Sequence, residues 1–151
     1  LIGYNPEEAE DLSLDQLNQI PDGPDITISD AYPTGALIQN TANGGVYYVE
    51  SGIKYPLWSK ELIKINFPKM KIYPASQKQL DQYKDGSPIT FKDGTLLKSS
   101  DAPVVYVISN GKKLRIPDEK TFLAFHYKWT NIISTNAKVL TLYPDGDPVT
   151  F

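Results

Sequence analysis

The chain has 151 residues, enough for one domain or two small ones, and its 40% apolar and 22% charged content is typical of a globular fold. It has no cysteine and one histidine, His126, which excludes disulfides, thiolate metal sites and histidine-rich metal centres. No apolar run approaches the ~18 residues of a membrane-spanning helix, so we expect no membrane insertion. The first residue is Leu1, and no basic segment followed by an apolar one opens the chain.

The formal net charge of −3 is distributed unevenly. Residues 1–33 contain eight acidic residues and no basic one, whereas residues 34–92 contain eight lysines and four acidic residues. The acidic segment could therefore dock on the basic middle of this chain or of another copy. We expect no nucleic-acid partner, because the chain is acidic overall and its longest basic run is Lys112-Lys113.

An internal repeat is the strongest pattern in the sequence. Residues 35–91 and 92–151 align along most of their length, and they end in the matching tetrapeptides PITF and PVTF. Residues 13–23 match the rear part of both copies. We therefore predict an acidic rear half-repeat over residues 1–26, a junction over 27–34, repeat one over 35–91 and repeat two over 92–151.

The first copy predicts a β-hairpin with strands over 46–50 and 53–57, turning at Ser51-Gly52. Ser59 is expected to cap a helix over 60–67. A strand over 71–73 follows, and then a short helical turn capped by Ser76.

The second copy predicts the same order of elements. A strand over 95–98 precedes a hairpin that turns at Asn110-Gly111, a dipeptide that favours a type I′ turn. In the returning strand, Lys113 and Arg115 are expected to face outward and Leu114 and Ile116 inward. Lys54, at the position of Lys113 in the first copy, is likewise expected to face outward. The remaining elements are a helix over 119–127 capped by Asp118, a strand over 132–133 and a helical turn capped by Asn136. The predicted fold class is α+β, a tandem repeat of small β-rich units.

The aromatic residues are the main candidates for ligand contact. The chain has ten tyrosines, five phenylalanines and two tryptophans, and aromatic faces can stack on sugar rings. The candidate ligand-binding residues are Trp58, Trp129, Tyr55, Lys54, Lys113 and Arg115. The aromatics could instead belong to the core, and the basic residues could instead keep an edge strand from aggregating.

No catalytic motif is present, so we expect a non-catalytic protein without a cofactor. Asp145 and Asp147 are weak calcium candidates, because they place carboxylates close together in a turn. The ligand spacing of an EF-hand is absent, and Asp-Gly is first of all a turn signal.

The second copy resembles tandem repeats of about 60 residues in bacterial secreted and cell-surface proteins. The matching segments are DGTLLK (93–98), VYVI (105–108), GKK (111–113), IP (116–117), Trp129 and YPDGDP (143–148). The resemblance covers nearly the whole chain and is looser in the first copy. It implies an extracellular accessory module and assigns no catalytic residue.

Two functions are therefore expected from the sequence. The first is a non-catalytic extracellular repeat module that attaches a larger bacterial protein to a cell-surface or glycan polymer such as cell-wall polysaccharide. The alternative is a self-assembling structural repeat, in a stalk, surface layer or filament, whose partners are other copies of itself.

Overall fold

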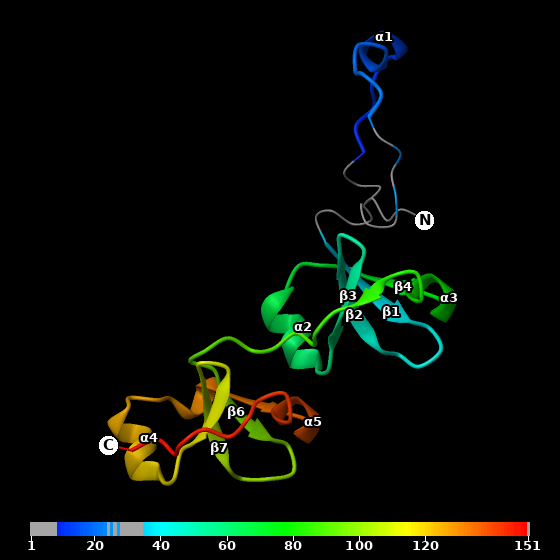
Figure 1. The fold of residues 1–151 in the computed structure, drawn as a ribbon. Coiled ribbons are helices and arrows are strands. Elements are labelled where there is room, and N and C mark those ends of the chain that lie inside the picture. Colours follow the sequence, from blue (N-terminus) through cyan, green and yellow to red (C-terminus); the bar gives the residue numbers. More distant parts are fainter. Residues whose placement is uncertain (1–8, 24, 26, 28–34, 151) are drawn as a thin grey trace. The chain divides into compact units, whose positions relative to one another are not determined.

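The computed structural model describes residues 9–23, 25, 27 and 35–150. They form two compact units, each with its own β-sheet (Figure 1). The first unit consists of the described residues up to Pro56 together with Met70–Ser87, and the second of Leu57–Lys69 together with the described residues from Pro88 onward. The expected α+β class is confirmed, because short helices accompany both sheets. The predicted junction over 27–34 lies almost wholly outside the described residues.

The first sheet has the strand order β4-β1-β2-β3-β5. Strand β1 pairs antiparallel with β2 and parallel with β4, and β3 pairs parallel with β5. Ser51 and Gly52 have positive φ angles of 49° and 76°, as the tight turn between β2 and β3 requires. The elements of this unit are β1 (Ala36–Asn40), β2 (Val46–Glu50), β3 (Ile53–Leu57), β4 (Ile72–Ala75), α3 (Gln77–Leu80) and β5 (Lys84–Asp85).

The second sheet has the strand order β8-β7-β6-β9. Its hairpin turns at Asn110 and Gly111, whose φ angles of 51° and 68° confirm the predicted turn. The strands are β6 (Leu96–Ser99), β7 (Val105–Ser109), β8 (Lys112–Arg115) and β9 (Ile132–Thr135). The helices of this unit are α2 (Lys60–Asn66), α4 (Glu119–Ala124), the 3-10 helix η3 (Trp129–Asn131) and α5 (Ala137–Leu140).

The two sheets pair equivalent residues in the same register. Leu37 lies opposite Ile72 in the first sheet, and the equivalent Leu96 lies opposite Ile132 in the second. In each unit, a short segment after the last helical turn pairs in parallel with the second strand of the hairpin, at Lys54–Asp85 in the first unit and at Lys113–Asp145 in the second. We call residues 84–86 and 144–146 the closing segments of the two units. The sequence predictions did not include this last pairing.

Two clusters of buried side chains illustrate how the sheets are covered. One joins the first sheet to α3 and contains Ile38, Val49, Ala75, Leu80 and Tyr83. The other joins the second sheet to α4 and contains Leu96, Val107, Ile116, Phe122 and Val149. Each cluster consists of residues from one unit only.

Helix α4 ends at Ala124, three residues before the predicted end. His126 adopts a left-handed φ of 56°, which cannot continue an α-helix. The His126 amide donates to the Leu123 carbonyl and the Tyr127 amide to the Phe122 carbonyl, the pairing of a Schellman motif. The Tyr127 ring packs edge-on against the Phe122 ring, at 5.5 Å between centroids.

Helix α1 (Leu14–Leu17) lies in the acidic N-terminal segment and has no buried residue. The Ser13 hydroxyl and the Gln16 side chain hold it in a capping box. The longest described helix, α2, has seven residues, whereas a bilayer requires about 20. None of the helices in the described part of the chain could therefore span a membrane.

Candidate functional site

The second unit contains an open cleft of about 270 Å³ between β7, β8 and the residues around α4. Three kinds of side chain line it: apolar groups, a stacked aromatic pair and charged groups at the rim. Its lining residues are Pro103, Val104, Val105, Arg115, Ile116, Pro117, Asp118, Glu119, Phe122 and Trp129. We call it the Trp129 cleft.

The Trp129 ring forms one wall of this cleft. It stacks on Phe122 with 4.0 Å between centroids and 17° between planes. Phe122 is buried in the core, whereas Trp129 is 52% exposed. The η3 turn that carries Trp129 follows the Schellman motif at the end of α4. A rigid core residue therefore supports a flat aromatic surface that solvent can reach.

Three exposed charged residues accompany the aromatic wall. Arg115 is the last residue of β8, and Asp118 and Glu119 lie where α4 begins. The Asp118 carboxylate accepts a hydrogen bond of 2.8 Å from the Thr121 amide. This bond lowers the pKa of Asp118, because it stabilises the charged form. The rim therefore presents a guanidinium donor and carboxylate acceptors.

Trp129 and Arg115, two of the predicted ligand contacts, thus lie in one cleft. Trp58 has a different environment. Its ring is half-buried and lies under the Lys138 ammonium, 4.2 Å from the ring centroid. Its carbonyl accepts a hydrogen bond of 2.7 Å from the Asn136 side chain. One face of the Trp58 ring is therefore already covered within the second unit.

Tyr55 is half-buried in the first unit, with its ring 6.3 Å from the Tyr48 ring. The chain also passes close to it at Gly86, where an added Cβ atom would lie 2.5 Å from the Tyr55 ring. Tyr55 therefore takes part in packing the closing segment of the first unit.

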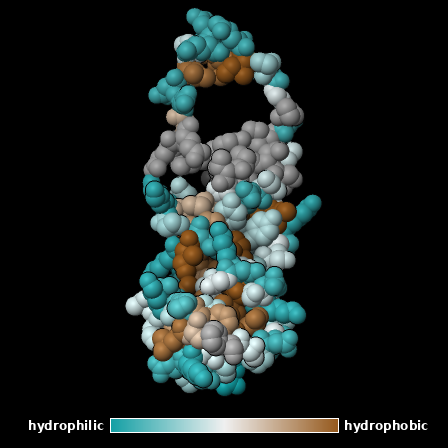
Figure 2. Space-filling model, turned by 90° about the vertical axis from the view of Figure 1, so that its left-hand side faces the viewer, coloured by the Kyte–Doolittle hydropathy of each residue, from teal (hydrophilic) through white to brown (hydrophobic). Residues whose placement is uncertain are grey.

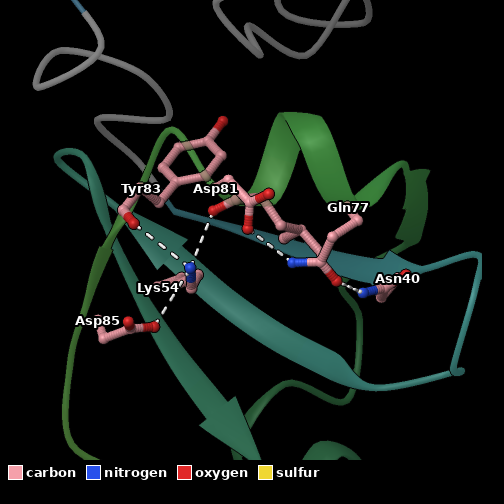
Figure 3. Close-up of polar contacts among 7 residues, drawn as sticks. Asn40, Lys54, Gln77, Asp81, Tyr83 and Asp85 are labelled. Atoms are coloured by element: carbon pink, nitrogen blue, oxygen red, sulfur yellow. Dashed lines mark hydrogen bonds and ion pairs between the residues drawn. The ribbon is translucent and has the colours of Figure 1, made fainter.

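The expectation that Lys54 faces outward was wrong. Lys54 is buried, and its ammonium donates to the carbonyls of Leu80, at 3.0 Å, and Tyr83, at 3.4 Å (Figure 3). It also lies 3.2 Å from the Asp85 carboxylate. The strand pattern failed here because the helical turn after α3 places its carbonyls over the sheet and gives the ammonium polar partners below the surface.

Lys113 repeats this arrangement in the second unit. Its ammonium donates to the Tyr143 carbonyl at 2.9 Å and lies 3.0 Å from the Asp145 carboxylate. The Lys113 side chain is only 15% exposed, so its expected outward orientation was also wrong. Both lysines hold the closing segment of a unit against its hairpin.

The structure offers little support for the calcium candidates. Asp145 pairs with Lys113, and no group of three or more His, Cys, Asp or Glu side chains able to hold a metal occurs in the described part of the chain. Asp145 and Asp147 are therefore not joined by a third acidic side chain in the part of the chain that the structure describes.

Sequence reasoning missed the rim residues Asp118 and Glu119, and Phe122 as the support of Trp129. Asp118 was identified only as a helix cap. An exposed cap next to a predicted strand end is the signal that could have pointed to the rim. Nothing in the local sequence indicates that Phe122 and Trp129 stack.

Comparison with known proteins shows a partial similarity to a bacterial protein. The chain is 25% identical over 107 residues, or 70% of its length, to Protein CgeD of Bacillus subtilis (strain 168). The match covers 24% of that protein, so the chain spans about a quarter of its length. No protein-family model matches the chain.

Proposed function

We propose that this chain is a non-catalytic extracellular repeat module that attaches a larger bacterial protein to a cell-surface or glycan polymer. In this proposal it comprises two complete repeats and the rear half of a third. The extracellular location follows from the resemblance to repeats of secreted proteins. The similarity to a segment of a much longer bacterial protein is compatible with a module of a larger chain.

The observation that carries the proposal is the half-exposed Trp129 ring stacked on buried Phe122 in a cleft with a charged rim. The C–H-rich face of a pyranose ring can lie flat on an indole ring and bury apolar surface there. Sugar hydroxyls could then donate to Asp118 and Glu119 and accept from Arg115. A sugar ring suits such a site because one of its faces is apolar and its edge carries hydroxyl groups.

Tryptophan fluorescence tests the proposal directly, because the chain has only two tryptophans. In Trp58→Phe the only indole is Trp129, and in Trp129→Phe it is Trp58. We expect soluble cell-wall oligosaccharides or other glycan fragments to change the emission of Trp58→Phe in a saturable way. The emission of Trp129→Phe should not change, because its remaining indole, Trp58, is already covered on one face by the Lys138 ammonium.

Co-sedimentation with insoluble cell wall supplies the second readout. Trp129→Ala and Arg115→Ala should each reduce the bound fraction, whereas Trp58→Ala should bind like the wild type. Circular dichroism establishes that each variant is folded before binding is compared. Equal binding by wild type and Trp129→Ala would contradict the proposal, as would wild-type protein that pellets equally without polymer.

A further inference from the structure

Three segments of the chain share one local structure. Helices α1, α3 and α5 each have four residues and an N-cap side chain that accepts from the third helical amide: Ser13, Ser76 and Asn136. The cap ψ angles are 157°, 160° and 153°, and the residue after each helix has a ψ of −13°, −12° and −13°. The rear half-repeat therefore has the same helical turn as the rear parts of the two complete repeats.

The environments of these turns differ. Leu80 and Leu140, at the end of α3 and α5, are 1% and 8% exposed, whereas the equivalent Leu17 is 53% exposed. Three residues further on, Tyr83 and Tyr143 are buried, but the equivalent Ile20 is 57% exposed. Figure 2 shows apolar side chains gathered along one side of this segment. The face that the complete repeats bury is open here.

The first complete repeat shows which groups cover such a face. Leu80 and Tyr83 pack on Ile38 of β1 and Val49 of β2. Lys54 of β3 binds the carbonyls of Leu80 and Tyr83 and the carboxylate of Asp85. The rear half-repeat has Leu17, Ile20 and exposed Asp22 at the corresponding positions. Its complement is therefore a hairpin with an apolar face and one buried lysine.

Neither of the two sheets in the described part of the chain can offer that surface without losing its own rear part. Strand β4 and α3 already cover the first sheet. Strand β9 pairs with the second sheet, and α5 has already buried its own Val139 and Leu140. A covalently attached rear part has a far higher effective concentration than the same segment of a second copy. An isolated four-residue helix is also unstable in water, so the capped turn needs a packing partner.

We propose that residues 9–23 dock on the front half of a further repeat, outside these 151 residues, which has a lysine at the position of Lys54 and Lys113. Residues 9–12 would add to its first strand in parallel, as β4 adds to β1 and β9 to β6. Its lysine would bind the Leu17 and Ile20 carbonyls and the Asp22 carboxylate. The proposal concerns a surface separate from the Trp129 cleft and does not depend on glycan binding.

A fusion protein tests this. In the fusion, a copy of residues 93–125 replaces Leu1 and Ile2 and is joined directly to Gly3. Gly3 then follows the copied Phe125, at the position that His126 has in the second repeat. The left-handed φ of 56° at His126 is one that glycine adopts easily. Hydrogen exchange at the Leu17 and Ile20 amides is compared in the fusion and in the unfused chain. We expect exchange to slow by at least about tenfold in the fusion. Replacing the copied lysine, Lys113→Met in the added segment, should remove most of that protection.

Two further variants of the fusion test whether the apolar side of the α1 segment makes the contact. Leu17→Asp should abolish the protection, whereas Gln19→Ala should keep it, because Gln82 at the equivalent position of the first repeat is exposed. Unchanged exchange in the fusion would overturn the proposal. It would also be overturned if the unfused chain formed dimers that Leu17→Asp dissociates in sedimentation velocity, because the partner would then be a second copy.

Discussion

In each of the two units, a lysine with little solvent exposure holds the closing segment against the hairpin. In the first unit, the Lys54 ammonium donates hydrogen bonds to the Leu80 and Tyr83 carbonyls and pairs with the Asp85 carboxylate. These contacts connect the hairpin to the closing segment. Methionine has a similar length and no donor, so Lys54→Met leaves the Leu80 and Tyr83 carbonyls without this partner. We expect the free energy of unfolding to fall by about 1–3 kcal/mol, measured by urea denaturation.

The matched control is Lys60→Met, which replaces an exposed lysine at the start of α2. Its stability should stay within about 0.5 kcal/mol of the wild type. If the two variants were equally stable, the closing role of Lys54 would have to be abandoned.

Tyr143 makes stability depend on pH in the alkaline range. Its hydroxyl accepts a hydrogen bond of 2.6 Å from the Phe91 amide. Burial raises the pKa of Tyr143 above its usual value of 10.0. As pH rises past about 10, the unfolded chain therefore loses this proton before the folded chain does. The contribution of Tyr143 is fully present below that pH and is lost as pH rises through the pKa of the folded state.

Tyr143→Phe tests this sign. The variant should be less stable at pH 7, because the Phe91 amide loses its partner. The gap between wild type and variant should then narrow above about pH 10, in denaturation curves recorded at a series of pH values. A gap of constant size up to pH of about 12 would show that ionisation of Tyr143 is not linked to folding.

At the scale of elements, capping side chains determine where the helices begin. One of these caps, Asn136, also forms a hydrogen bond to a residue far away in the sequence. Asn136 caps α5 by accepting from the Val139 amide at 3.1 Å, and it donates to the Trp58 carbonyl at 2.7 Å. Asn136→Ala removes both bonds and should lower the free energy of unfolding by about 2 kcal/mol, since a cap and a hydrogen bond each contribute about 1 kcal/mol.

Asn136→Ser separates the two bonds, because serine is a good cap but has no second group to reach Trp58. Its loss of stability in thermal or urea denaturation should be about half that of Asn136→Ala. A serine variant as unstable as the alanine variant would mean that the cap itself contributes nothing.

At the scale of the whole molecule, the described chain has separate buried clusters in its two units. Ile38 lies in a cluster formed by the first unit, and Leu96 in one formed by the second. Truncating either to alanine removes core contacts worth about 2–5 kcal/mol. We expect Ile38→Ala to accelerate native-state hydrogen exchange in β1 and β2 while β6 and β7 keep their protection, and Leu96→Ala to do the reverse.

The two variants serve as controls for each other. Equal acceleration in both sheets by either substitution would mean that the units unfold as one cooperative body, contrary to this prediction.

Local chemistry in the sequence determined most of the elements. The bounds of β2 and β3 match the prediction, and Ser59, Ser76, Asp118 and Asn136 all cap helices as expected. These features depend on residues within about four positions of one another, through turn angles and capping bonds, so they are visible in a single sequence.

Only the tertiary structure decided which side chains face solvent at the candidate site. Lys54 meets carbonyls 26 and 29 positions away, and Trp58 meets Asn136 across 78 positions. These contacts bury one predicted ligand residue and cover another, while Trp129 stays half-exposed on Phe122. The physical reason is that the alternation of a strand specifies two faces, but only packing specifies what lies on each of them.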